Sequence, residues 1–294
     1  MNIRSLNSFW KMILLAVFVS EGSLLNAQTD EERKYNPALG WYYGMNMGST
    51  LPSGHSASFY NGSENNENKL SRILNNTYYK TQIVQAIGYN YLDYDLPAQM
   101  GYKPNFTVGG YARYQFTNRS SFMVQANYAR LTATDIFLLN LDVPQGFSFD
   151  ATYLECSIMG QEERTYIDLG YRFDVPSQSQ HNTYLEIGIN MNNTKVLKNM
   201  IQIETLEYNI KYVGEQPTGP YGQDPEYDIY QGGIGFGGFF SAGYSLRFNE
   251  KITLDPVATV YFTQTQLEGY NELKPGFNLM FRFTFRDFDF TAQD

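Results

Sequence analysis

The segment TVGGYARYQFTNRSSFMVQANYARL, residues 107–131, decides the fold class of this chain. In each half, apolar side chains alternate with polar or small ones; Val108, Ala112 and Phe116 share one face of the first half. This period of two predicts two antiparallel strands, and the polar TNRS between them predicts a hairpin turn. If the apolar face points inward, the fold is a water-soluble sandwich or barrel. If it points outward, the surrounding solvent must be lipid.

The N-terminus has the features of an export signal. Arg4 and Lys11 precede the apolar run 12–19, and the polar stretch after that run ends in Asn-Ala-Gln. This order predicts a secretory signal peptide over residues 1–27, cleaved after Ala27. The alternative is a buried first helix, since the apolar run is too short to span a membrane.

The composition narrows the class of protein further. The chain has a net charge of −9 and no basic patch, so we expect no nucleic-acid partner. Its single cysteine, Cys156, cannot form an intramolecular disulfide. After the signal no run of eighteen apolar residues occurs, but an exported chain can still cross a membrane as a closed barrel. The 25 tyrosines and 21 phenylalanines are typical of barrels with aromatic girdles.

The alternating pattern recurs along the chain and predicts eight strands. They cover residues 39–48, 107–116, 122–128, 165–173, 183–191, 232–248, 252–263 and 277–285. An even number of strands, with short connections alternating with long ones, is typical of bacterial outer-membrane barrels. We therefore predict an all-β fold: an eight-stranded antiparallel transmembrane up-and-down barrel over residues 39–286, in the bacterial outer membrane. Residues 28–38 are expected to form a short periplasmic segment and 287–294 a C-terminal tail.

The face opposite the apolar one predicts a charged lumen. Strands with up to four phenylalanines on one face could not expose that face to water, so it is predicted to meet lipid. The inward face then carries a set of charged residues that we expect to form a structural ion-pair network: Arg113, Asp168, Arg172, Glu186, Arg247, Asp255 and Arg282. Charges crowded in a narrow barrel are expected to pair. The alternative is that each arginine reaches periplasmic water.

The long connections, at about 51–104, 135–163 and 192–229, are predicted to lie outside the cell. The first is polar at its start and is expected to be mobile. It also contains a helical spacing, consistent with a short capping helix or simple loop packing, at Leu70, Ile73, Leu74 and Tyr78. Its tyrosine-rich end, 89–102, is interpreted as a contact surface or an extension of the aromatic belt. The second long connection is expected to prolong its strands into a projecting hairpin.

No residue pattern predicts catalysis, a cofactor or a metal site. His55 and His181 are predicted on opposite sides of the membrane, and Ser56 and Ser58 beside His55 lack a rigidly held orienting carboxylate. The third long connection ends in acidic residues without the ligand spacing of an EF-hand loop, at Asp224, Glu226 and Asp228. We therefore predict a protein that is not an enzyme.

The Asn-Ala-Gln cleavage region, the strand motifs GYARYQF and GYSLRF, and the phenylalanine-rich last strand resemble a known group. They are similar to the small outer-membrane β-barrel proteins of Bacteroidota, the PorT-like and OmpA-like barrels. The resemblance implies an integral outer-membrane protein that serves as an accessory part of a secretion, assembly or uptake machine. The expected partners are outer-membrane lipids, lipopolysaccharide and other outer-membrane or surface proteins. A narrow channel and a barrel enzyme remain the alternatives.

The chain departs from the group in its long outer loops and in its terminal phenylalanine, which is internal at Phe285 or displaced to Phe290.

Overall fold

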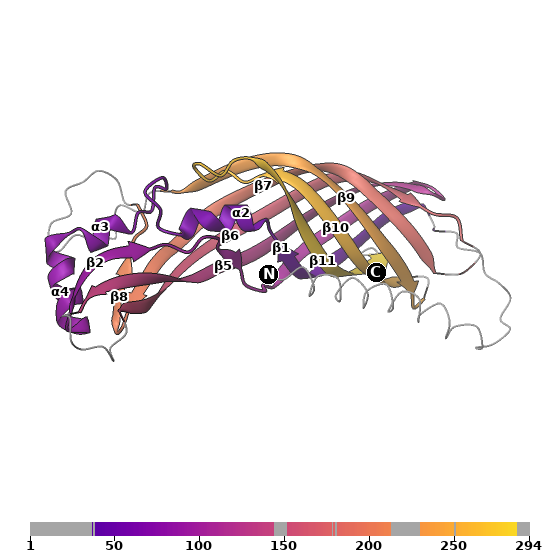
Figure 1. The fold of residues 1–294 in the computed structure, drawn as a ribbon. Coiled ribbons are helices and arrows are strands. Elements are labelled where there is room, and N and C mark those ends of the chain that lie inside the picture. The colour runs from indigo at the N-terminus through magenta and orange to yellow at the C-terminus, as the bar shows by residue number, and fades with distance from the viewer. Residues whose placement is uncertain are drawn as a thin grey trace, which may run out of the picture.

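Eight antiparallel strands close into a ring in the part of the chain that the structure describes (Figure 1). The computed structural model describes residues 37, 39–143, 152–177, 179, 181–212, 230–249 and 251–286. The ring strands are β1 (Gly40–Leu51), β4 (Thr107–Thr117), β5 (Ser120–Asp142), β6 (Tyr153–Asp174), β7 (Asn182–Ile203), β9 (Gly232–Arg247), β10 (Ile252–Gln264) and β11 (Leu273–Arg286). Each pairs with the next, and β1 also pairs with β11, so the sheet is an up-and-down barrel as predicted.

The first and last strands close the ring over ten paired positions, which include Met45 opposite Phe283. Both ends of the barrel chain therefore lie at the same end of the barrel as the three short connections, which join β4 to β5, β6 to β7 and β9 to β10. The described parts of the other connections lie at the opposite end. This is the arrangement of short turns and long loops that the sequence predicted.

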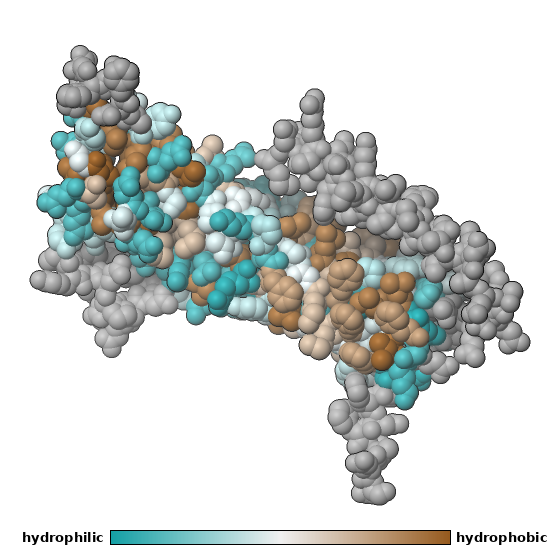
Figure 2. Space-filling model, turned by 90° about the horizontal axis from the view of Figure 1, so that it is seen from below, coloured by the Kyte–Doolittle hydropathy of each residue, from teal (hydrophilic) through white to brown (hydrophobic). Residues whose placement is uncertain are grey.

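The apolar side chains of the ring point outward. Trp41, Phe122, Phe236 and Phe281 are 50–62% exposed, and Figure 2 shows apolar residues gathered over the barrel between more polar zones. The alternate positions of the same strands are buried and mostly polar or charged. A closed ring with this facing is inconsistent with a water-soluble sandwich, whose apolar faces would meet in a core.

Three ring strands, β5, β6 and β7, continue far beyond the others as an extension of the same sheet. On β5, residues 131–142 extend roughly 40 Å along the strand past the outward apolar positions. The edges of this extension are lengthened by β2 (Asn90–Asp95) and β3 (Gly101–Tyr102), which pair with β5, and by β8 (Leu206–Asn209), which pairs with β7. We call this the projecting sheet. The predicted projecting hairpin is thus confirmed for β5 and β6.

Short helices of the first long connection pack on the inner face of the projecting sheet. They are α2 (Gly54–Ala57), the 3₁₀ turn η1 (Ser58–Tyr60), α3 (Ser71–Leu74) and α4 (Thr77–Ile87). In Figure 1, α3 and α4 lie beside the far end of the projecting sheet. None of the helices in the described ranges has the length and apolar character needed to cross a membrane. Together these helices and the projecting sheet form what we call the outer cap.

The outer cap has its own hydrophobic core. The first long connection and the strands contribute buried side chains to it: Ala57, Phe59, Tyr60, Leu70, Ile73, Leu74, Ile83, Tyr91, Met100, Ala133, Phe137, Leu139, Cys156, Ile158, Val196, Ile201, Ile203, Tyr208, Ile210 and Leu267. The expectation of a mobile polar loop at the start of the first connection was therefore wrong. Burial of this apolar surface holds the connection against the strands.

The helical spacing from Leu70 to Tyr78 does not form one helix. The helix α3 ends at Leu74, and Asn76 starts α4 by accepting a hydrogen bond from the backbone N–H of Tyr78 (3.0 Å). Tyr78 is therefore exposed, whereas Leu70 and Ile73 are buried. The helix α4 ends at Gly88, whose φ of +78° favours glycine.

Several predicted segments lie outside the described residues. They are the signal peptide 1–27, residues 28–36 and 38, the tail 287–294, and the acidic residues Asp224, Glu226 and Asp228.

Candidate functional site

The lumen at the short-turn end of the barrel is filled by charged side chains. Arg172 on β6 lies at the centre of this set and is fully buried. Its Nε donates to Oδ1 of Asp174 (3.0 Å), and its Nη1 lies 3.4 Å from Oδ2 of Asp255 and 4.0 Å from Oε1 of Glu186. One guanidinium thus contacts three carboxylates that come from β6, β7 and β10.

Two further arginines complete this network. Nη1 and Nη2 of Arg282 donate to the two carboxylate oxygens of Glu186, at 2.7 and 3.2 Å. Nη1 of Arg113 lies 3.8 Å from Asp174, which also accepts from the side-chain amide of Gln115 (3.0 Å). Removing each of these charges from water costs free energy. Only ion pairs and hydrogen bonds of good geometry offset that cost in a buried site.

A tyrosine ring lies beside each of these guanidinium groups. Arg172 lies over the ring of Tyr184, with its Cζ 3.4 Å from the ring centroid. Likewise Arg282 lies over Tyr111 (3.7 Å), and Arg113 over Tyr42 (4.0 Å). The tyrosine rings lie next to the arginine–carboxylate pairs, and their π faces attract the guanidinium cations.

The structure brings together most of the residues expected in the lumen network. Arg113, Arg172, Glu186, Asp255 and Arg282 form it, and Arg172 pairs in register with Glu186. Two other positions differ from expectation.

Asp168 lies apart from these ion pairs and instead accepts hydrogen bonds from Gln125 (2.6 Å), Asn190 (2.5 Å) and Tyr261 (2.8 Å). Arg247 is opposite Thr253 as expected, but it lies at the rim, where its backbone N–H donates to Nδ1 of His181 (3.2 Å). Asp255 contacts Nη1 of Arg172 (3.4 Å) and accepts a hydrogen bond from the hydroxyl of Ser245 (2.8 Å).

Sequence reasoning missed Asp174. This buried carboxylate contacts both Arg113 and Arg172. It shares the inward parity of Asp168 and Arg172 on β6, which is the signal that could have identified it. Asp174 is the last residue of the strand and directly precedes the turn, and aspartate is also a common turn residue. From the sequence it could therefore be assigned to the turn.

A second polar cluster closes the mouth at the opposite end of the lumen. The carboxylate of Glu162 on β6 accepts from Nε of Arg164 (2.6 Å) and from the hydroxyl groups of Tyr60 (2.5 Å) and Tyr102 (3.1 Å). Nη2 of Arg164 donates to Ser56 and to Tyr102, both at 3.0 Å. We call this cluster the mouth latch, because it fastens the first long connection to the wall of the barrel.

The mouth latch is buried, and burial affects its ionisation. Burial, followed by the nearby Glu162 carboxylate, raises the pKa values of Tyr60 and Tyr102 above their ordinary range. Both hydroxyl groups therefore remain protonated donors to Glu162. The latch tyrosines lie in the first long connection; Tyr102 belongs to the segment interpreted as a contact surface or belt, and it instead points into the mouth.

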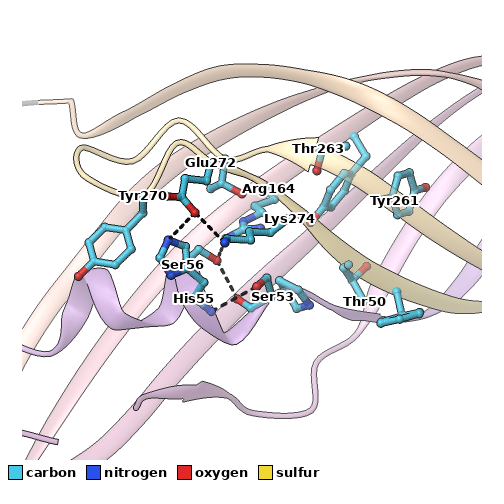
Figure 3. Close-up of a pocket in the computed structure, with 15 residues that line it drawn as sticks. Thr50, Ser53, His55, Ser56, Arg164, Tyr261, Thr263, Tyr270, Glu272 and Lys274 are labelled. Carbon is cyan, nitrogen blue, oxygen red and sulfur yellow. Dashed lines mark hydrogen bonds and ion pairs between the residues drawn. The ribbon is translucent and has the colours of Figure 1, made fainter. Parts of the chain in front are cut away.

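A small cleft beside the latch contains the only histidine of the first connection (Figure 3). Nε2 of His55 lies 3.9 Å from the carboxylate of Glu272, which also pairs with Lys274 at 2.6 Å. The hydrogen bond from Lys274, and then the charges of Lys274 and His55, lower the pKa of Glu272. These contacts join α2 to the start of β11.

The same cleft holds the serine that could act as a nucleophile. The hydroxyl of Ser56 donates to the carbonyl oxygen of Ser53 (3.0 Å) and accepts from Arg164. His181 lies at the other end of the barrel, next to the start of β7. Within the described ranges no group of three or more His, Cys, Asp or Glu side chains is arranged to hold a metal ion.

The fold is similar to those of solved bacterial proteins at low sequence identity. Neisserial surface protein A (NspA) shares 11% identity, with 84% of this chain and 97% of that chain covered and a TM-score of 0.42. The outer membrane protein OprG from Pseudomonas aeruginosa shares 9%, with 88% and 100% covered and a TM-score of 0.41. For Ail, the attachment invasion locus protein of Yersinia pestis, the values are 11%, 84%, 100% and 0.32.

No protein-family model matches the sequence, and the search of curated proteins gave no match. Likenesses this distant carry no argument about function. The fold class rests on the strand register: an eight-stranded, closed, antiparallel β-barrel with an apolar exterior and a charged, packed interior.

Proposed function

We propose that this chain is an integral protein of the bacterial outer membrane without enzymatic activity, which presents the outer cap to other proteins. It would act as an accessory or scaffold subunit of a secretion, assembly or uptake complex. The observation that carries this proposal is the division of the molecule into two parts: a barrel whose lumen is packed with paired charges, and a hydrophobic-cored cap continuous with three barrel strands.

The membrane location is supported by the exterior of the ring. Exposed apolar side chains occur on all sides of the barrel, whereas the interior carries the charges. Every ring strand has a partner on both sides, so no unpaired sheet edge would face hydrocarbon.

The packed lumen favours a scaffold over a narrow channel. Eight strands leave an interior just wide enough for side chains. Here Arg172, Arg282 and their tyrosine partners occupy it at one end, and the mouth latch occupies it at the other. An ion crossing the barrel would have to displace both groups.

The mouth cleft does not favour an enzyme. Its histidine contacts Glu272, but the neighbouring Ser56 hydroxyl donates to a backbone carbonyl and accepts from Arg164. A nucleophile needs its proton directed to a base. The cleft residues therefore serve better as fasteners of the first connection.

The outer cap is suited to contact proteins because it extends beyond the apolar exterior on strands that continue from the barrel. Its core is buried, and it exposes large apolar side chains, including Leu92, Ile136 and Tyr153. Exposed apolar and aromatic residues on a rigid support are typical of contact surfaces.

Site-specific photocrosslinking in intact cells tests the proposal. A crosslinking amino acid placed at Ile136 or Tyr153 should give a discrete adduct with a second protein. The same residue placed at Phe281, which is equally exposed but lies on the barrel, should give none. Equal protein adducts from cap and barrel positions, or none from the cap in a correctly inserted protein, would count against the scaffold role.

A further inference from the structure

A row of charges crosses the outer face of β5, β6 and β7 just beyond the apolar exterior. Arg130 on β5 is opposite Glu163 on β6, and Glu163 is opposite Lys195 on β7. Two rows nearer the short-turn end, the outward residues are Ile167 and Met191, which belong to the apolar exterior. The change from apolar to charged side chains therefore occurs over four paired positions, with Thr165 and Asn193 in the outward row between them.

The carboxylate in this row positions the arginine. Nη2 of Arg130 lies 2.7 Å from Oε1 of Glu163, which also accepts from the hydroxyl of Tyr128 (2.6 Å). The Arg130 side chain is 56% exposed and that of Glu163 26% exposed. Glu163 is thus directed to its two neighbours on β5, while the guanidinium remains accessible from outside.

Two more cations lie in the next row outward. Lys198 on β7 is opposite Gln161 on β6 and is exposed. The backbone N–H of Lys103 donates to the carbonyl oxygen of Thr132 on β5 (2.8 Å), so Lys103 continues β3. Since Tyr102 points into the mouth latch, the alternation of a strand places Lys103 on the outer face, where it is exposed. We call Lys103, Arg130, Lys195 and Lys198 the cationic band.

The cationic band contrasts with the rest of the protein. Its two rows bring four cations together with one carboxylate, in a chain whose net charge is −9. On the other side of the mouth, around the connection from β10 to β11, the described charges include three carboxylates, Glu67, Glu268 and Glu272, and one cation, Lys274, which pairs with Glu272. Positive charge is therefore concentrated on the side from which the projecting sheet rises.

We propose that the cationic band binds the phosphate groups of lipopolysaccharide, with the acyl chains of the same molecule packed on the apolar exterior next to it. This proposal rests on the outer-membrane location proposed above. A phosphorylated, acylated glycolipid fits both halves of this surface, because Arg and Lys bind phosphate oxygens and the adjacent side chains are apolar. An acidic protein would be complementary to the charges alone.

Binding of purified lipid A to the refolded full chain in mild detergent tests the proposal. Native mass spectrometry should detect bound diphosphoryl lipid A with the wild-type protein. The dephosphorylated lipid A should bind at least tenfold more weakly to the same protein, a comparison that needs no variant. Added salt should weaken the binding of diphosphoryl lipid A more than that of the dephosphorylated form, because salt screens the charge interaction with phosphate.

A variant with Lys103→Gln, Arg130→Gln, Lys195→Gln and Lys198→Gln should lose the preference for diphosphoryl lipid A. The matched control, Arg119→Gln with Lys251→Gln, neutralises two exposed cations at the short-turn end and should keep the preference. A gel-mobility difference between unboiled and boiled samples reports barrel folding in every case.

The outcomes separate the two proposals. A folded, membrane-inserted wild-type protein that binds both forms of lipid A equally would overturn the cationic band as a phosphate site and leave the outer-membrane role standing. A wild-type protein that does not insert into lipid vesicles would overturn both.

Discussion

The ring of Tyr60 lies directly against the Cα atom of Gly160 on β6, so that a β-carbon at position 160 would collide with the ring. The hydroxyl of the same tyrosine donates to Glu162 (2.5 Å). A single glycine thus allows the first long connection to reach a buried carboxylate on a strand about a hundred residues later in the chain.

Replacing Gly160 with valine should release the mouth latch. The side chain would displace Tyr60 and leave Glu162 buried without one of its donors, a loss of about 1–3 kcal/mol or more. Hydrogen exchange of residues 54–60 should become faster. Gly110→Val is the control, because a β-carbon there meets no atom within 4 Å. Equal exchange in both variants would contradict the latch.

Removing Arg282 should destabilise the barrel strongly. Arg282→Met would leave the fully buried Glu186 with Arg172 as its remaining cation, at 4.0 Å. Breaking a buried pair in this way costs about 3–5 kcal/mol. The temperature at which the folded gel band disappears should fall clearly, whereas Arg119→Met in an exposed turn should leave it unchanged. A similar result for the two variants would mean that the lumen pairs do not support the fold.

The lumen should be closed to ions. Planar-bilayer recordings of the wild-type protein should show no steady single-channel conductance, because paired side chains fill both ends of the lumen. The double variant Arg172→Ala, Arg282→Ala removes the central cations and should conduct if it inserts. Steady conductance of the wild-type protein would instead favour the channel.

Two equally exposed apolar residues should respond differently to charge. Phe281 on the barrel is 55% exposed and Ile136 on the projecting sheet is 50% exposed. Phe281→Arg should cost about 2–4 kcal/mol if the residue lies near the bilayer midplane. Ile136→Arg should change stability by about 0.5 kcal/mol or less, because its surroundings are water. Refolding equilibria in lipid vesicles measure both values, and equal costs would disprove the proposed position of the membrane.

The mouth should be more stable in mild acid than at neutral pH. Burial, and then a hydrogen bond with Glu268, raise the pKa of Glu67, whose carboxylate also accepts from Gln231 (2.6 Å). A carboxyl group whose pKa is raised in the folded protein contributes stability below its unfolded pKa of about 4.3. That contribution is lost as the pH rises through the pKa of the folded protein.

Glu67→Gln should therefore slow hydrogen exchange of the mouth at pH 7 relative to the wild-type protein, and this difference should vanish near pH 4. Glu207→Gln on the exposed strand β8 is the matched control. A difference that persists unchanged at pH 4 would exclude repulsion between Glu67 and Glu268 as its cause.

The barrel could be predicted from the sequence because its determinants are local. A period of two assigns each side chain to lipid or lumen without knowledge of any partner, and this placed Arg172 and Glu186 on the same face. The position of Arg247 was harder to predict, since parity gives the face of a residue but not its depth. It is the last residue of β9, at the short-turn end of the barrel.

The outer cap could not be predicted in the same way, because its determinants are distant contacts. Residues that suggest a mobile loop have structural partners there: the side-chain amide of Asn66 donates to the carbonyl oxygens of Ser58 and Phe59, and Ser53 caps α2. Phe59 and Tyr60 lie within a polar stretch, but Tyr60 packs on β6 at Gly160 and Phe59 packs edge-on against Tyr270. A periodic pattern within the first connection cannot predict burial against strands that are distant in the sequence.

The packing of the first long connection on β6 has a consequence for biogenesis. Residues 52–106 connect β1 to β4. Their apolar partners lie in β5, β6 and β7, which are synthesised and exported later. We therefore expect the connection to cross the outer membrane as an unfolded segment and to wait outside the cell until those strands arrive. The final step of maturation would then take place on the cell surface, where neither ATP nor cytoplasmic chaperones can assist it.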